Sequence, residues 1–477
     1  MSSIPRRSLS RGPRCRCGKE SERNGTLIGT HVHYRPAEGY LGPPLQPRLL
    51  PMARRSLDRF DENSPLAATV RRLCLADFDG PATTSFDAVA AWQPLLDRGT
   101  ELWLDTGDAN AAAALWCSEF TALTTNNTLL NKEVQKGIYD ELVPGAAAAV
   151  HEGNPEIDEA SAVLEIAFIL NAVHGLKLVA QFGAKVSVEL HTDLAHDLEA
   201  SVAYGRRYFS ICPSHFIVKV PLTAEGIVAA RRLRDDGIPI NFTLGFSARQ
   251  NLLIAAAAQP AYCNVFMGRV NAFFADRGFG DGVNAGERAT AASQRTLIEL
   301  RNAGISDTRQ IGASMRGPAQ VPSLAGLDVY TMPAPVAAAY LEQALGTSSH
   351  GINDDFPVTF VDGVDAGKDG LHVFWDVDAE SRAAVDALAS QPVADLDGDG
   401  VRRILGEHGA ASFFPSFTAE ELERVSADGK IPEVAPWLSG VHDGRLAWDT
   451  MLTIAGLQSF ATDQGALDDR IRTVTTG

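Results

Sequence analysis

Eight short apolar segments alternate with amphipathic segments between residues 101 and 332, and this alternation restricts the fold more than any other feature. Helix-like stretches such as AEGIVAARRLRDDG and SARQNLLIAAAAQ separate most of the apolar segments. Strand–helix alternation predicts a parallel sheet, and eight such units match a (β/α)8 TIM barrel. A doubly wound open sheet is second choice, because no G-x-G-x-x-G follows the first strand. The predicted strands are ELWLD, TALTT, KVSVEL, HFIVKV, IPINFTL, YCNVFM, RQIGAS and LDVYTM.

The chain before the barrel has a different composition. Residues 1–55 carry eleven Lys/Arg against three Glu, with five prolines after residue 35, which predicts a disordered basic tail. A targeting arm, or an upstream extension that ends before Met52, would also fit this composition. The barrel domain is predicted over residues 56–345, with a leading helix for which Ser64-Pro65 is a candidate start.

The chain after the barrel changes pattern twice. Residues 346–440 break the alternation, and DFPVTFVDG, KDGLHVFWDV and AASFFPSFTAEELERV predict a mixed α+β insertion with two or three strands. Residues 441–477 return to helical periodicity and predict a C-terminal helix that packs on the barrel.

Composition narrows the class of protein. The net charge of -17 argues against nucleic acid as the main partner. The most apolar stretch, AVLEIAFILNAVHGLKLVA, is interrupted by four polar residues and predicts a buried helix rather than a membrane span. The N-terminus lacks an apolar signal region, and the six cysteines are scattered, so we expect a cytoplasmic protein.

No metal site is expected. Cys15 and Cys17 form C-R-C, but no second Cys/His pair with zinc-like spacing follows. The stretch DLDGDG, residues 395–400, opens like a calcium loop but has Gly406 where the loop needs a glutamate.

One predicted strand has a lysine inside its apolar run. In FIVKV, Lys219 shares a strand face with Ile217, and the remaining three residues share the other face. Barrel strands are buried on both faces, and lysine is rarely buried without a partner. Burial disfavours an ammonium, and a neutral amine can attack a carbonyl to form a Schiff base. The alternative is a structural lysine paired with Asp105 or Glu189, and strand position alone does not separate the two.

Other polar residues occupy the ends of the predicted strands, where barrels place their reactive groups. Asp105 could act as the base for C–C cleavage, and Glu189 with Thr243 could hold a water for proton transfer. Asn126 and Asn241 could hold sugar hydroxyls. Two arginines and a hydroxyl, Arg269, Arg316 and Ser314, could clamp a phosphate. Asn264 closes the sixth strand.

In this order, these residues resemble the transaldolase family. The motifs that carry the resemblance are LDTGDANAA, TTNNTLL, KVSVEL, FIVKVPLTAEGIVAARRL, INFTLGFSARQ, NVFMGRV, GASMRGPAQVPSLAGLDVYTMP and the final GLQSFATDQGALDDRIR. They cover about residues 100–340 and 455–472.

The resemblance implies a class I aldolase chemistry that needs no metal or organic cofactor. It makes Lys219 the Schiff-base residue, Asp105 the general base, Glu189 the acid/base carboxylate and Thr243 its water-holding partner. It makes Asn126, Asn241, Asn264 and Phe266 substrate residues, and it assigns the phosphate to Arg269, Ser314 and Arg316. Glu189 and Phe266 favour true transaldolases over the fructose 6-phosphate aldolase branch, which has Gln and Tyr there.

The sequence departs from the family pattern near the substrate. Asn127 stands in place of a proline, Leu190-His191-Thr192-Asp193 replaces V-D-x-R, and Asn264 replaces a serine. The expected function is transfer of a dihydroxyacetone unit between phosphosugars in the non-oxidative pentose phosphate pathway. An enzyme acting on another ketose in specialised metabolism and a non-catalytic phosphosugar-binding protein are the alternatives. Phosphosugars are the expected partners, nucleic acid and membranes are not, and a homodimer is left open.

Overall fold

The structure is a computed structural model that describes residues 62–346 and 351–476. The basic tail predicted for residues 1–55, with Cys15, Cys17 and Met52, lies outside the described residues. Everything below concerns the unit that begins after Arg48.

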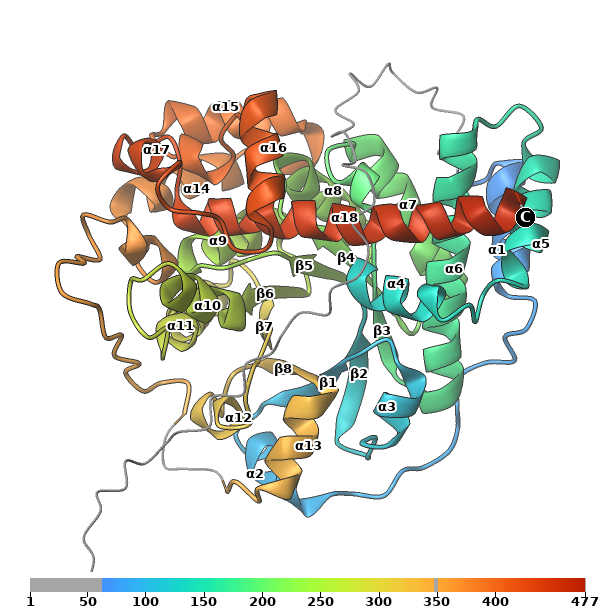
Figure 1. Cartoon of the computed structure of the whole chain (residues 1–477), viewed down its shortest axis with the longest axis horizontal. Helices are drawn as coiled ribbons and strands as arrows, with labels where there is room; N and C mark the ends of the chain where they lie inside the picture. Colours follow the sequence, from blue (N-terminus) through green and yellow to red (C-terminus); the bar gives the residue numbers. More distant parts are fainter. Residues whose placement is uncertain (1–61, 347–350, 477) are drawn as a thin grey trace, which may run out of the picture. The chain divides into compact units, whose positions relative to one another are not determined.

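Eight parallel strands close into a barrel in chain order, which confirms the predicted (β/α)8 TIM barrel (Figure 1). Each strand coincides with one of the predicted apolar segments to within about two residues. The strands are β1 (Glu101–Asp105), β2 (Phe120–Thr124), β3 (Lys185–Glu189), β4 (Phe216–Pro221), β5 (Ile240–Thr243), β6 (Tyr262–Phe266), β7 (Arg309–Ala313) and β8 (Val329–Pro333).

Helices precede the barrel and connect its strands. Before β1 lie α1 (Pro65–Cys74), the 3-10 turn η2 (Ala90–Trp92) and α2 (Gln93–Leu96). The connecting helices are α3 (Ala109–Ala113), α4 (Asn127–Gln135), α5 (Leu142–Gly153), α6 (Glu159–Phe182), η3 (Thr192–Leu194), α7 (Leu198–Ile211), α8 (Ala224–Asp235), α9 (Ala248–Leu253), the π-helical η4 (Ile254–Ala258), α10 (Met267–Asp276), α11 (Ala285–Asn302), α12 (Gln320–Ser323) and α13 (Ala334–Glu342).

Local sequence signals start these helices where they were expected. Ser64 caps α1, because its hydroxyl accepts from the Ala67 N–H at 3.1 Å and Pro65 occupies the first helical position. Thr223 caps α8 in the same way, accepting from the Gly226 N–H at 2.9 Å. The chain therefore turns sharply after β4, which places the end of that strand at the rim of the barrel.

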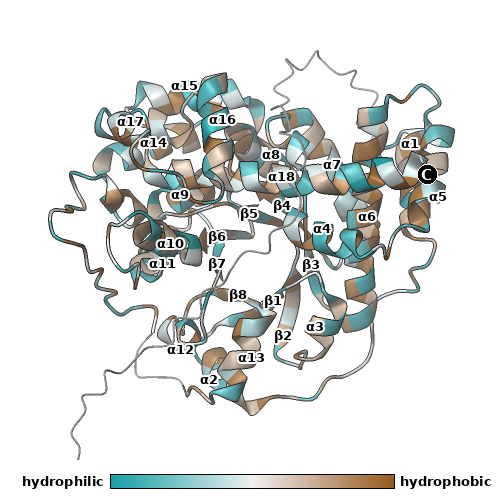
Figure 2. Ribbon diagram, in the orientation of Figure 1, coloured by the Kyte–Doolittle hydropathy of each residue, from teal (hydrophilic) through white to brown (hydrophobic). Residues whose placement is uncertain are grey.

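The helix predicted to be buried is α6. Among the described residues it alone is long and apolar enough to cross a membrane, yet 89% of its most apolar window is buried in the protein. Figure 2 shows apolar residues along much of its length. Its one deeply buried glutamate, Glu165, is paired with Arg207 of α7 at 2.5 Å. The helix packs against the outside of the barrel, since Gly175 leaves room for Phe216 of β4.

The barrel interior has an apolar lower part and a polar upper part. Trp103 and Tyr262 meet edge-to-face below, with ring centroids 4.8 Å apart. Above them, towards the C-terminal ends of the strands, side chains pair through hydrogen bonds: Thr331 with Thr124 at 2.8 Å, and Asn241 with Ser187 at 3.0 Å. This polar layer is the floor of the site described below.

Residues after the barrel form helices rather than the predicted α+β insertion. The elements are η5 (Leu371–Phe374), α14 (Ala379–Ala389), η6 (Val393–Asp395), α15 (Gly398–Glu407), η7 (Ala411–Phe413), α16 (Ala419–Asp428) and α17 (Leu438–His442). In place of the predicted strands, the described residues have one isolated antiparallel bridge, between Gly280 and Phe360. The apolar residues instead pack singly on α10: the rings of Phe360 and Phe374 lie 6.2 and 5.7 Å from that of Phe274. These aromatic contacts with α10 bury the apolar residues without pairing them in strands.

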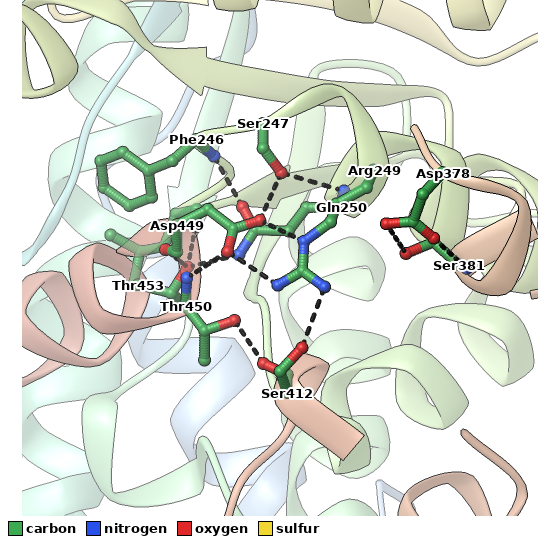
Figure 3. Close-up of polar contacts among 11 residues, drawn as sticks. Phe246, Ser247, Arg249, Gln250, Asp378, Ser381, Ser412, Asp449, Thr450 and Thr453 are labelled. Carbon is green, nitrogen blue, oxygen red and sulfur yellow. Dashed lines mark hydrogen bonds and ion pairs between the residues drawn. The ribbon is translucent and has the colours of Figure 1, made fainter. Parts of the chain in front are cut away.

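The predicted C-terminal helix is α18 (Trp448–Thr476), which runs past the insertion helices and β4 towards α5 (Figure 1). A buried polar network anchors its first turn to the loop after β5 (Figure 3). Asp449 forms a two-pronged ion pair with Arg249 at 2.8 Å for each bond, and accepts from the Ser247 hydroxyl at 2.6 Å. Ser412 of the insertion accepts from Arg249 at 3.1 Å. Barrel, insertion and final helix therefore meet at one point.

Candidate active site

Lys219 of β4 projects into the polar upper part of the barrel and is 2% exposed. Ile217 packs with the barrel interior, whereas Phe216, Val218 and Val220 pack with the outer helices, as the strand alternation predicts. The Lys219 ammonium donates to Glu189 Oε2 at 3.3 Å and to the Thr125 carbonyl at 3.2 Å. The partner is Glu189, one of the two carboxylates named as structural alternatives.

Glu189 ends β3 directly beside Lys219 in the strand register. Burial raises the pKa of Glu189, against the opposing effects of the Lys219 ammonium, a hydrogen bond from the Asn127 backbone N–H, and Arg269. The departure at Asn127 matters here, because a proline at this position would have no N–H to donate. Asn127 therefore helps to keep the Glu189 carboxyl ionised beside the amine.

Asp105 lies at the end of β1, on the same rim. Burial raises its pKa, and Lys219, Arg316 and Lys132 act in the opposite direction in decreasing order. A carboxyl with a raised pKa inside a cationic surrounding is suited to take up and release a proton.

Thr243 and Asn241 of β5 carry buried polar atoms that face the site. Neither Thr243 Oγ1 nor Asn241 Oδ1 has a hydrogen-bond partner among the described residues. Leu244, which follows Thr243, has a φ of 67°, a conformation that a bulky residue rarely adopts. The Thr453 hydroxyl of α18 donates to its carbonyl at 2.9 Å. The final helix thus supports the strained turn beside Thr243.

Two of the predicted substrate residues have structural hydrogen bonds. Asn126 caps α4, with its side-chain oxygen accepting from the Leu129 N–H at 2.8 Å. Asn264 is 2% exposed, and its side-chain oxygen accepts from the Gly245 N–H at 3.3 Å. Asn126 still lies at the rim, whereas the side chain of Asn264 joins the middle of β6 to the loop after β5.

Arg269 lies in the first turn of α10 and is 8% exposed. Its guanidinium carbon lies 5.3 Å from the ring centre of Phe266 and 5.5 Å from that of Phe460 of α18. Burial lowers the pKa of Arg269 to about 10, and the neighbouring Arg316 adds to this effect. Its Nη1 has no hydrogen-bond partner among the described residues. An anion at this position would pair with the guanidinium groups of both Arg269 and Arg316.

Ser314 and Arg316 follow β7 and complete the predicted clamp. Ser314 has a φ of 64°, and its carbonyl lies against Gly268, where a β-carbon would come within 2.0 Å of it. The Arg316 side chain lies on the same glycine. Burial lowers the pKa of Arg316, and the Asp105 carboxylate opposes this effect. Gly268 therefore lets the two arginines approach each other.

The final helix contributes residues that the site prediction missed. The Phe460 ring centre lies 6.0 Å from Lys219 Nζ, and Asp463 accepts a hydrogen bond from the Thr128 hydroxyl. A β-carbon at Gly456 would lie 2.9 Å from Arg269 Nη1. These three residues are spaced by four and three positions, so one face of the helix covers the site. That spacing was the available signal in GLQSFATDQG.

His191, a second departure from the family pattern, also contacts the final helix. Its Nε2 lies 3.3 Å from Asp468 Oδ1. Burial lowers the pKa of His191, but Asp468 and Asp193 outweigh this effect and the net shift is upward. The chain after Glu189 is thereby tied to the helix that covers the site.

The described residues contain no group of three or more His, Cys, Asp or Glu side chains that could hold a metal ion. The calcium-like stretch is a helix start, since Asp397 caps α15 by accepting from the Gly400 N–H at 2.7 Å.

Comparison with known proteins identifies the family of the chain. The family model for transaldolase/fructose-6-phosphate aldolase matches residues 102–365. The transaldolase of Xanthomonas euvesicatoria pv. vesicatoria is 31% identical over 234 residues, which cover 48% of this chain and 71% of that protein. The probable transaldolase of Thermus thermophilus is 34% identical over 249 residues, which cover 51% of this chain and 92% of that protein. The chain belongs to the transaldolase/fructose-6-phosphate aldolase family.

Proposed function

We propose that this protein is a transaldolase that transfers a dihydroxyacetone unit from a ketose phosphate to an aldose phosphate through a Schiff base on Lys219. The observation that carries the proposal is the buried Lys219–Glu189 pair, with Nζ and Oε2 3.3 Å apart inside the barrel. A buried ion pair is costly to maintain for stability alone. Its retention here is explained if the amine and the carboxylate exchange a proton during catalysis.

The first half of the reaction uses Lys219 and Asp105. The amine adds to the C2 carbonyl of the ketose phosphate, and loss of water gives an iminium. Asp105 then takes the proton of the C4 hydroxyl as the C3–C4 bond breaks. The bonding electrons pass to the iminium, which leaves an enamine on Lys219 and releases an aldose phosphate.

The second half reverses these steps with a different aldehyde. The enamine carbon adds to the acceptor carbonyl, Asp105 returns the proton to the new hydroxyl, and water hydrolyses the iminium to free Lys219. Glu189 and the Thr243 hydroxyl would hold and deprotonate that water, which gives the buried Oγ1 a partner. Arg269, Ser314 and Arg316 would bind the phosphate. The side-chain amides of Asn126 and Asn241 would bind the sugar hydroxyls between the phosphate and Lys219.

The test is a coupled assay for glyceraldehyde 3-phosphate released from fructose 6-phosphate. Turnover is expected only when erythrose 4-phosphate is present as acceptor, and not for Lys219→Met. Equal turnover without acceptor, with free dihydroxyacetone as product, would instead indicate an aldolase. Absence of turnover with fructose 6-phosphate and sedoheptulose 7-phosphate would contradict the proposal.

A different ketose is the second candidate, and the departures at Asn127 and His191 favour it. Both residues lie next to Glu189, and the second is tied to α18 by Asp468. The same assay with other ketoses, phosphorylated and not, compares the candidates through kcat/KM. Function in the pentose phosphate pathway, in the cytoplasm, remains a prediction, as does a homodimer.

A further inference from the structure

The ring of Phe460, on α18, lies beside two cations of the site at once. Its centre is 6.0 Å from Lys219 Nζ and 5.5 Å from the guanidinium carbon of Arg269. Both distances fall within the range over which a cation and the face of an aromatic ring attract each other. One side chain of the final helix is thus a neighbour of both the proposed Schiff-base lysine and the proposed phosphate ligand.

Phe460 belongs to the part of α18 that packs on the barrel interior. It is 3% exposed and shares a core cluster with Leu244, which follows β5, and Phe266, which ends β6. Leu467 and Ile471, one to three turns further along the helix, pack with the outer helices instead. The ring therefore lies with the site and not with the general core of the protein.

Hydrogen bonds on both sides of Phe460 fix the helix over the site. The Thr453 hydroxyl donates to the Leu244 carbonyl at 2.9 Å, and Asp463 accepts from the Thr128 hydroxyl. Thr453 precedes Phe460 by seven positions and Asp463 follows it by three, so the three side chains project from one face of the helix. The position of the ring is therefore set by contacts before and after it.

Two buried polar atoms near the ring have no hydrogen-bond partner among the described residues, Arg269 Nη1 and Asn241 Oδ1. Arg269 is the arginine beside the ring, and Asn241 is the direct strand partner of Lys219. A buried polar atom without a hydrogen bond costs free energy, which a ligand with phosphate and hydroxyl groups would recover. A ligand that satisfied both atoms would pass beside Phe460.

We propose that Phe460 is a substrate-contact residue: the carbon chain of the ketose phosphate lies against its ring, between the carbonyl carbon at Lys219 and the phosphate at Arg269. The proposal rests on the proposed function for the identity of the substrate. A flat apolar ring fits the C–H side of a sugar chain and leaves the hydroxyls on the other side to polar groups such as the Asn241 amide. Substrate recognition would then involve α18 as well as the rim of the barrel.

The test compares two probes whose binding needs no catalysis. Inorganic phosphate reports on the arginines alone, whereas glucitol 6-phosphate adds the carbon chain but has no carbonyl with which to form a Schiff base. Phe460→Leu should weaken the binding of glucitol 6-phosphate about tenfold in calorimetric titrations, which corresponds to the loss of one aromatic contact. It should weaken the binding of phosphate at most about twofold, because Arg269 keeps the ring of Phe266 at 5.3 Å.

Two further variants separate the ring from the stability of the helix. Phe460→Met has a side chain of similar length without a ring, so it should show the same selective loss even if the leucine variant is unstable. Leu467→Ala is the matched control on α18, because it removes fully buried contacts with the outer helices and none with the site. It should bind both probes as the wild type does, and thermal melts of every variant check folding.

Equal losses for both probes in the Phe460 variants would overturn the proposal, because Phe460 would then act only through Arg269. Unaltered binding of glucitol 6-phosphate, a similar loss in Leu467→Ala, or a wild type that does not bind glucitol 6-phosphate would overturn it as well. The proposed function fails by a different result, an intact Lys219 after incubation with ketose phosphates and reduction with borohydride. That result would leave the comparison of the two probes unaffected.

Discussion

Lys219 Nζ lies 3.3 Å from Glu189 Oε2 across two neighbouring strands, and both side chains are less than 5% exposed. The register of β3 and β4 sets this pairing, since the two residues are direct partners. A lysine that is held by one carboxylate and one carbonyl is fixed in position but not enclosed by anions. These two contacts hold the Lys219 amine in position, and only one of them is to an anionic group.

Asp105→Asn is expected to lower kcat by about 10²–10⁴-fold, because the asparagine cannot accept the C4 proton. In the wild type, kcat should fall on acidification at a pH above the usual value for aspartate, since burial raises the pKa of Asp105. The pH profile of kcat measures this limb. An unaltered kcat in Asp105→Asn would exclude Asp105 as the base.

The raised pKa of Asp105 also affects the stability of the fold, which it lowers at neutral pH. As pH rises above the usual aspartate pKa, the unfolded chain loses the proton before the folded protein does, so Asp105 destabilises the fold through that window and above it. Asp105→Asn should therefore melt at or above the wild-type temperature at pH 7, and the difference should shrink below pH ~4. A large fall in melting temperature at pH 7 would contradict this.

Thr243→Val keeps the shape of the side chain but removes a hydroxyl that has no partner among the described residues. The variant is expected to gain roughly 1 kcal/mol in the free energy of unfolding. Its kcat should fall about ten- to a hundredfold if the hydroxyl holds the catalytic water. Denaturant unfolding and steady-state kinetics measure the two effects. Full activity would remove Thr243 from the mechanism.

Gly456→Ala tests how closely α18 covers the phosphate clamp. The added methyl would lie 2.8 Å from Leu244 Cδ2 and 2.9 Å from Arg269 Nη1, so either the helix or the arginine must move. KM for fructose 6-phosphate should rise at least several-fold. Gly465→Ala is the matched control on the same helix, because its methyl would meet nothing within 4 Å. It should keep the wild-type KM and gain up to ~1 kcal/mol in stability.

Asp449→Asn tests the anchor of α18 shown in Figure 3. The change leaves the Arg249 guanidinium buried at 4% exposure without its carboxylate, which should cost about 3–5 kcal/mol. Adding Arg249→Met should recover part of this loss, because it removes the unpaired charge. Chemical denaturation of the two single variants and the double variant measures the coupling. Simple additivity would show that the pair does not act as a unit.

The barrel could be predicted because its signals are local. Each strand is an apolar segment, and caps such as Ser64 and Thr223 begin the helices at the expected residues. The position of the residues that could carry the chemistry could be predicted as well, because parallel strands bring their C-terminal ends to one rim of the barrel. Lys219 and Glu189 pair there, and Asp105 and Thr243 lie at the ends of β1 and β5, while the catalytic roles of all four stay predictions.

The insertion and the cover of the site could not be predicted in the same way. Short aromatic segments such as HVFWDV fit a strand or a packed turn equally well, and contacts with Phe274 decided the outcome. The role of Asn127 depends on a backbone N–H, which a side-chain pattern does not reveal. Phe460 reaches the site from more than 200 residues beyond Lys219, so only the tertiary structure brings it there.

Trapping of the Schiff base tests the central claim most directly. The protein is incubated with fructose 6-phosphate, reduced with borohydride and digested, and the adduct is mapped by mass spectrometry. A reduced three-carbon or six-carbon adduct should be found on Lys219 and be absent from Lys219→Met. An intact Lys219 after reduction with fructose 6-phosphate and with sedoheptulose 7-phosphate would contradict the mechanism.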